Sequence, residues 1–110
     1  MIIRNSSNSK VSWEHEGEAR VWHLLEEGEC VVINNVEEVM VEKELKPHRS
    51  KFPAEEFYYI LKGRGIMYIN GDEKEVFPGD LIYIPPGSLH GIKVVGETVL
   101  YFLSWKIPIK

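Results

Sequence analysis

The chain has 110 residues, of which 44% are hydrophobic and 27% are charged. This length fits a single domain, and the apolar content excludes an intrinsically disordered chain. Thirteen Lys and Arg residues against 17 Asp and Glu residues give a net charge of −4, which argues against a nucleic-acid-binding surface. The first ten residues lack the apolar segment of a secretory signal, and no apolar run approaches the roughly 18 residues of a membrane span. The lone Cys30 fits a reducing compartment, so we expect a cytoplasmic protein with no membrane contact.

Apolar residues recur mostly at every second position, a pattern that predicts β-strands rather than helices. The predicted strands share this alternation or a β-branched and aromatic composition. They lie at residues 20–25, 30–33, 39–45, 57–61, 65–69, 73–77, 81–84, 92–95 and 98–105.

Turn residues separate these strands. Asn70 and Gly71 between two alternating runs predict a tight β-hairpin, and the turn at Pro85, Pro86 and Gly87 ends the strand before it. Residues 1–10 are polar and are interpreted as a loose or exchanged arm. Eight or nine short strands without a convincing helix predict an all-β sandwich or barrel, formed by one domain over residues 1–110.

The chain has four histidines, and two of them lie near groups that could share a metal ion. His48 precedes the carboxylate pair Glu55 and Glu56, and His90 follows the Pro-Pro-Gly turn. Two histidines and one carboxylate from different strands could hold a divalent metal and leave coordination positions open.

Two segments resemble the motifs of the cupin superfamily. Residues 47–65, PHRSKFPAEEFYYILKGRG, are similar to the first cupin motif, and residues 79–90, GDLIYIPPGSLH, to the second. The second match is close, because Gly79, Pro85, Gly87 and His90 have the spacing of the motif. The resemblance implies a small single-domain cupin: a jelly-roll β-barrel, or double-stranded β-helix, whose mouth holds a metal on three His and one Glu. It also implies a homodimer.

The first motif departs from the family pattern. Where the family has His-x-His, this chain reads His48-Arg49-Ser50, and the spacing to Glu56 is one residue longer than usual. An alignment with a one-residue insertion places His48 and Ser50 at the two ligand positions. An ungapped alignment instead places Arg49 and Lys51 there, which would destroy the metal site.

From the gapped alignment, the predicted metal ligands are His48, Glu56 and His90, which would bind Fe(II), Mn(II), Ni(II) or Zn(II). Water or Ser50 would complete the shell. Glu56 has the alternative of pairing with a nearby Arg or Lys. Tyr58 shares the parity of Glu56 and should point the same way, either to orient substrate or to fill the core. Ser50, Tyr58 and Arg49 are the predicted substrate-binding residues.

Three functions remain open at this point. The first is a metal-dependent enzyme, of dioxygenase or isomerase type, acting on a small oxygen-bearing molecule. The second is a non-catalytic, metal-poor cupin that binds a sugar or an anionic small molecule through Arg49 or Lys51. The third is a barrel with a structural or partner-binding role.

Several residues outside the motifs have simpler interpretations. His15 and His23 are interpreted as structural or surface residues, and the acidic group that includes Glu14 as a solvated face. Three tryptophans are expected to be buried either in the core or at a dimer contact: Trp13, Trp22 and Trp105.

Overall fold

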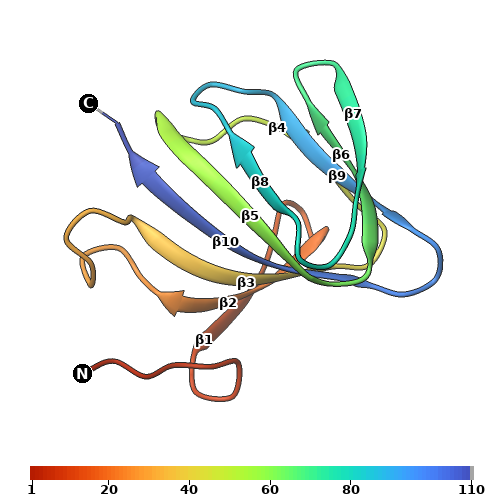
Figure 1. Ribbon diagram of the computed structural model, residues 1–110. Coiled ribbons are helices and arrows are strands. Elements are labelled where there is room, and N and C mark those ends of the chain that lie inside the picture. Colours follow the sequence, from red (N-terminus) through yellow and green to blue (C-terminus); the bar gives the residue numbers. More distant parts are fainter. Residues whose placement is uncertain (110) are drawn as a thin grey trace.

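The computed structural model describes residues 1–109, which form ten strands in two antiparallel sheets packed face to face (Figure 1). The larger sheet has the strand order β1-β2-β3-β10-β5-β8, and the smaller sheet has the order β4-β9-β6-β7. Residues 1–109 contain no helix, and therefore none long and apolar enough to cross a membrane. The prediction of an all-β jelly roll is confirmed. The strands are β1 Lys10–Glu14, β2 Ala19–Leu25, β3 Asn35–Val41, β4 Glu44–His48, β5 Ala54–Lys62, β6 Arg64–Ile69, β7 Asp72–Val76, β8 Leu81–Ile84, β9 His90–Val95 and β10 Leu100–Pro108.

The predicted single strand at residues 39–45 is wrong. β3 ends at Val41, the exposed Glu42 and Lys43 turn the chain, and β4 begins in the other sheet. The alternation continues across this bend because Val41 and Leu45 are both buried. Period-two patterning therefore could not reveal the change of sheet.

One predicted strand is absent and one observed strand was not predicted, and strand pairing explains both differences. Residues 30–33 form a bend with Val31 and Val32 exposed, so their β-branched composition has no neighbouring strand to pair with. The short strand β1 was not predicted from its sequence, KVSWE, but it pairs with β2 along its whole length. Tertiary pairing decides both cases.

The inward rows of three neighbouring strands change from apolar to polar toward the same end of the barrel. Along β5 the buried residues run from Ile60 through Tyr58 to Glu56, and along β10 from Phe102 through Ser104 to Lys106. β3 follows the same order, with its apolar residues at the Val41 end. Because β10 is antiparallel to both β3 and β5, the polar residues meet at one end and the apolar core fills the other.

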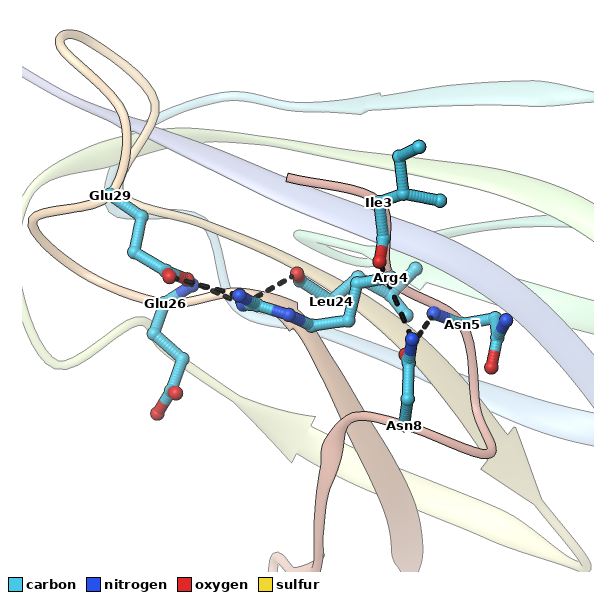
Figure 2. A network of polar contacts seen from close by, with 7 residues as sticks. All are labelled: Ile3, Arg4, Asn5, Asn8, Leu24, Glu26 and Glu29. Atoms are coloured by element: carbon cyan, nitrogen blue, oxygen red, sulfur yellow. Dashed lines mark hydrogen bonds and ion pairs between the residues drawn. The ribbon is translucent and has the colours of Figure 1, made fainter. Parts of the chain in front are cut away.

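The N-terminal segment contacts its own chain through Arg4 (Figure 2). The Arg4 guanidinium donates to the Leu24 carbonyl at 3.0 Å and to the two carboxylate oxygens of Glu29 at 2.6 and 3.1 Å. The side chain of Asn8 accepts from the Asn5 N–H at 2.7 Å and closes a turn. These contacts hold the segment beside the end of β2.

The outer face of the larger sheet is strongly aromatic. The rings of Phe57 and Trp105 stack with centroids 5.1 Å apart, and Tyr83 lies 5.4 Å from Phe57. Trp22 and Trp13 flank the guanidinium of Arg20 further along the sheet. None of the three tryptophans belongs to the buried core of the described residues, and Trp13 is 53% exposed. The core alternative for these side chains is therefore wrong.

We expect Gly63→Ala to destabilise the fold by about 2–4 kcal/mol. Gly63 alone connects β5 to β6, it has a φ of +85°, and an added Cβ would lie 2.5 Å from the Val99 carbonyl oxygen. Gly79→Ala is the matched control, because Gly79 has a φ of +93° but nothing within 4 Å of its Cβ position. The control should lose only about 1 kcal/mol. Urea unfolding of both variants measures the difference, and equal losses would contradict the close approach at Val99.

Candidate functional site

A cavity of about 610 Å³ opens at the polar end of the barrel. Its walls come from the larger sheet, from β4 of the smaller sheet and from the segment that follows β4. Most predicted site residues line it, namely His48, Arg49, Ser50, Glu56 and Tyr58, and so do His15, Glu37 and Lys106.

Backbone carbonyls fix the ring protonation of both predicted metal-binding histidines. His48 and His90 are paired neighbours on β4 and β9, and their ring centroids are 4.4 Å apart. The Nδ1 atom of His48 lies 2.9 Å from the Lys46 carbonyl, and that of His90 lies 3.2 Å from the Ser88 carbonyl. Because a carbonyl only accepts, Nδ1 carries the proton in each neutral ring and Nε2 presents a lone pair. This tautomer leaves Nε2 available to bind a metal ion.

The predicted hairpin at Asn70 helps to position His90. Asn70 has a φ of +48°, and the turn joins β6 to β7 as expected. The Asn70 N–H donates to the Leu89 carbonyl, and the Leu89 N–H donates to the Asn70 side-chain oxygen, both at 2.8 Å. These two bonds hold the residue immediately before His90.

Glu56 is a buried carboxylate between Ser50 and His90. The Ser50 hydroxyl donates to one carboxylate oxygen at 2.5 Å, and the other oxygen lies 3.5 Å from His90 Nε2. That nitrogen is buried and has no hydrogen-bond partner in the structure. A buried polar atom without a partner is costly. A cation bound between this nitrogen and Glu56 would provide the missing partner.

The surroundings of Glu56 keep it ionised. Burial alone would raise its pKa, but a hydrogen bond from His90 when its Nε2 carries a proton, the positive charge of Lys106 and the Ser50 hydroxyl together lower the pKa to about 2. Lys106 is the cross-strand neighbour of Glu56 on β10. For His48, burial lowers the pKa, so the ring is neutral near pH 7. The site thus combines an anionic carboxylate with a neutral imidazole.

The remaining predicted residues differ in exposure. Tyr58 points the same way as Glu56, is 2% exposed, and packs on Phe102 with ring centroids 4.2 Å apart. Burial, followed by the negative charge of Glu56, raises the pKa of Tyr58 well above its usual value. Arg49 and Lys51 are exposed at the cavity mouth, where Arg49 Nε donates to the Gly87 carbonyl at 3.3 Å.

His15 and Lys106 are among the cavity residues that were not predicted as part of the site. The ring of His15 lies 4.3 Å from that of His48, although His15 comes from the turn between β1 and β2. Lys106 lines the cavity near the end of β10. Its parity with Phe102 and Ser104 could have indicated an inward direction, whereas nothing in the local sequence connects His15 to His48.

A separate cluster adjoins the cavity on β1, β2 and β3. Glu14, His23 and Glu37 form a His/Glu triad whose ligand atoms lie within 4.8 Å of one another, close enough to hold a metal ion. His23 Nε2 is 3.2 Å from Glu14, and Nδ1 is 3.3 Å from Glu37. Burial, and then the charge of Glu14, raises the pKa of Glu37. The Glu14 side chain is 37% exposed, as expected for a solvated residue, and with Glu37 it lines the cavity wall.

Comparisons with known proteins agree with this fold. The family profile described as "Cupin domain" matches residues 35–106. An oxalate-binding protein of Thermotoga maritima is 30% identical over 97 residues, which are 81% of this chain and 75% of that protein. A crystal structure described as a predicted oxalate decarboxylase from Thermotoga maritima superposes with a TM-score of 0.85 and 26% identity, covering 99% of this chain and 100% of that chain.

A shorter match connects the chain to the uncharacterized protein MJ1618 of Methanocaldococcus jannaschii. The two are 44% identical over 57 residues, which are 52% of this chain. The matched segment spans 46% of MJ1618, so this chain corresponds to less than half of that protein.

Proposed function

This chain belongs to the cupin domain family, and on that basis we propose that it is a metal-dependent enzyme that acts on a small carboxylate. The observation that carries the proposal is the buried Nε2 atom of His90. It has no hydrogen-bond partner and faces the ionised carboxylate of Glu56 at 3.5 Å. In the neutral tautomer a lone pair faces a negative charge there, and a divalent cation bound to both groups would satisfy both.

The metal ligands in this proposal are His48, Glu56 and His90. Ser50 holds the carboxylate of Glu56 in place, and backbone carbonyls hold the two imidazoles. Imidazole and carboxylate donors suit Fe(II), Mn(II), Ni(II) and Zn(II). A divalent ion on these ligands would supply Lewis acidity and open positions for a bidentate substrate or for O₂.

Lys106 offers a positive group to an anionic substrate in a cavity that Glu14, Glu37 and Glu56 also line. Lys106 projects from the wall next to Glu56, and its Nζ lies 5.9 Å from the Phe52 ring centre. The structure records no ion pair within 4.0 Å between Lys106 and any carboxylate of residues 1–109. A lysine in this position could bind a substrate carboxylate by a charge-assisted hydrogen bond. The similarity to an oxalate-binding protein supports a carboxylate of that size.

Tyr58 is placed to help orient such a substrate. Its side chain lines the cavity, and its raised pKa keeps the hydroxyl protonated, so it can donate a hydrogen bond to a carboxylate. Arg49 and Lys51 at the mouth add positive charge along the entry path.

A second candidate function is binding of an anionic small molecule without metal or turnover. It is supported by the three cations that line the cavity, Arg49, Lys51 and Lys106. The two candidates differ in whether a carboxylate binds after the metal has been removed.

We also propose that the chain forms a homodimer in the cytoplasm. The aromatic outer face of the larger sheet leaves Tyr59 40%, Leu81 59% and Tyr83 46% exposed. Leu81 and Tyr59 are paired across β5 and β8, and Tyr83 is paired with Phe57, so these side chains form a continuous apolar surface. A second copy of the chain presents the same surface and would cover it by two-fold symmetry.

We expect protein purified without a tag or chelator to contain close to one metal ion per chain. Glu56→Gln should lose most of that metal, because the amide keeps the shape of the side chain but not its charge. His90→Ala should lose it as well. Mass spectrometry of the protein gives the metal content.

His23→Ala is the control for the metal measurement. It removes the histidine of the neighbouring triad and should leave the content unchanged. Wild-type protein that takes up none of Fe(II), Mn(II), Ni(II) and Zn(II) would refute the proposed enzyme. Metal loss confined to the His23 variant would show that the ion binds the triad instead.

Oxalate should bind the metal-loaded protein, and Lys106→Met should weaken its affinity roughly 10- to 100-fold, as expected for a lost charge-assisted hydrogen bond. Lys62→Met is the matched control, because Lys62 lies over Tyr101, outside the cavity. Titration calorimetry measures both variants. Equal affinities of wild type and Lys106→Met would exclude this role for Lys106, and full affinity of the chelated wild type would favour the metal-free binding function.

Light scattering should give a solution mass of about twice the 12.7 kDa of one chain. The double change Tyr59→Glu and Leu81→Glu should produce monomers, because it places charge in the centre of the apolar face. Val32→Glu is the control, since Val32 is 63% exposed and lies outside the strands. A monomeric wild type would contradict the proposed dimer.

A further inference from the structure

We infer that His15, on the turn between β1 and β2, is a third imidazole ligand of the proposed metal site. The inference rests on the proposed function, in which His48, Glu56 and His90 bind a divalent ion. The first cupin motif has a second histidine at the position where this chain has Ser50. In this inference, His15 of the N-terminal hairpin takes over the role of that histidine.

Two ring pairs, His15–His48 and His48–His90, each have the separation of adjacent imidazole ligands on one ion. Among residues 1–109, only Glu14, His23 and Glu37 already bring three ligand atoms within 4.8 Å of one another, so the three rings would move closer together when an ion binds. The ring of His48 lies between the other two, with centroid distances of 4.3 Å to His15 and 4.4 Å to His90. Two imidazoles bound at right angles to one ion, with metal–nitrogen distances of about 2.1 Å, would have ring centres roughly 4.6 Å apart. The rings are tilted by 47° and 56°, so they are not stacked in parallel.

Ser50 leaves the fourth protein ligand unassigned. Its hydroxyl donates to Glu56 at 2.5 Å, so it positions a ligand and its proton is already committed. His15 lines the same cavity as Ser50 and Glu56.

The turn that carries His15 has an unfavourable backbone. His15, Glu16 and Gly17 have φ angles of +53°, +58° and +87°, and the Gly17 N–H donates to the Glu14 carbonyl at 3.2 Å. The left-handed conformation costs a non-glycine residue about 1–2 kcal/mol. Strained backbone of this kind is concentrated at functional sites. In this turn the strained conformation coincides with the placement of His15 beside His48.

Another turn of this chain has positive φ angles but carries no proposed metal ligand. The hairpin between β6 and β7 uses Asn70 and Gly71, the residues that best tolerate positive φ. Asn at position 15 would therefore relieve strain in the β1–β2 turn and remove the imidazole. This separates a loss of metal binding from a loss of folding.

The test compares Co(II) binding by metal-free wild type, His15→Asn and Glu16→Asn. Affinities come from competition with a chromophoric chelator, and the visible spectrum of bound Co(II) reports its ligands. We expect His15→Asn to weaken Co(II) binding by at least roughly tenfold and to change the spectrum, with a melting temperature equal to or above that of the wild type. Glu16→Asn changes the same turn and should keep both the affinity and the spectrum.

The outcomes distinguish this inference from the proposed function. If wild type and His15→Asn bind Co(II) equally while Glu56→Gln does not bind it, His15 is not a ligand and the metal site stands without it. If His15→Asn and Glu16→Asn lose affinity equally, the turn rather than the imidazole matters, and the inference is again overturned. If wild type binds no Co(II), or if only His23→Ala abolishes binding, both the inference and the proposed site fail.

Discussion

The pairing of β10 between β3 and β5 is the constraint on which the site depends. Strand β10 is antiparallel to both neighbours, so the inward rows of all three strands become polar at the same end. Glu56 and Lys106 are direct partners in this register, and Ser104 is the partner of both Glu37 and Tyr58. A shift of one residue would turn the whole polar set outward and the aromatic face inward. The register therefore decides the core, the cavity and the outer apolar surface at once.

The burial of Glu56 beside His90 explains why the cavity is not simply filled with apolar side chains. A buried carboxylate is tolerated only with compensating partners, and here Ser50 and the charge of Lys106 supply part of the compensation. The Nε2 atom of His90 receives none. Natural proteins keep buried polar groups without partners mainly at functional positions, where a bound ligand provides the missing partner. In the proposed site, the groups whose burial is costly are the same groups that would bind the ion.

Sequence patterns predicted the parts of the structure that depend on local chemistry. The Asn70-Gly71 hairpin, the strand before Pro85 and the inward direction of Tyr58 follow from turn residues and parity. The split between β3 and β4 could not be predicted, because Val41 and Leu45 share one parity and are both buried although they lie in different sheets. His15 could not be assigned either. Its place beside His48 depends on how the β1–β2 hairpin folds over the cavity, which no local pattern records.

The two turns that have positive φ at non-glycine residues differ in what the backbone conformation costs. Asn70 adopts its conformation at little cost, and its side chain secures Leu89 next to His90. His15 and Glu16 adopt theirs against their intrinsic preference. A chain selected for stability alone would place Asn or Gly in both turns. The inferred role of His15 as a metal ligand would account for an imidazole in a strained turn, 4.3 Å from His48.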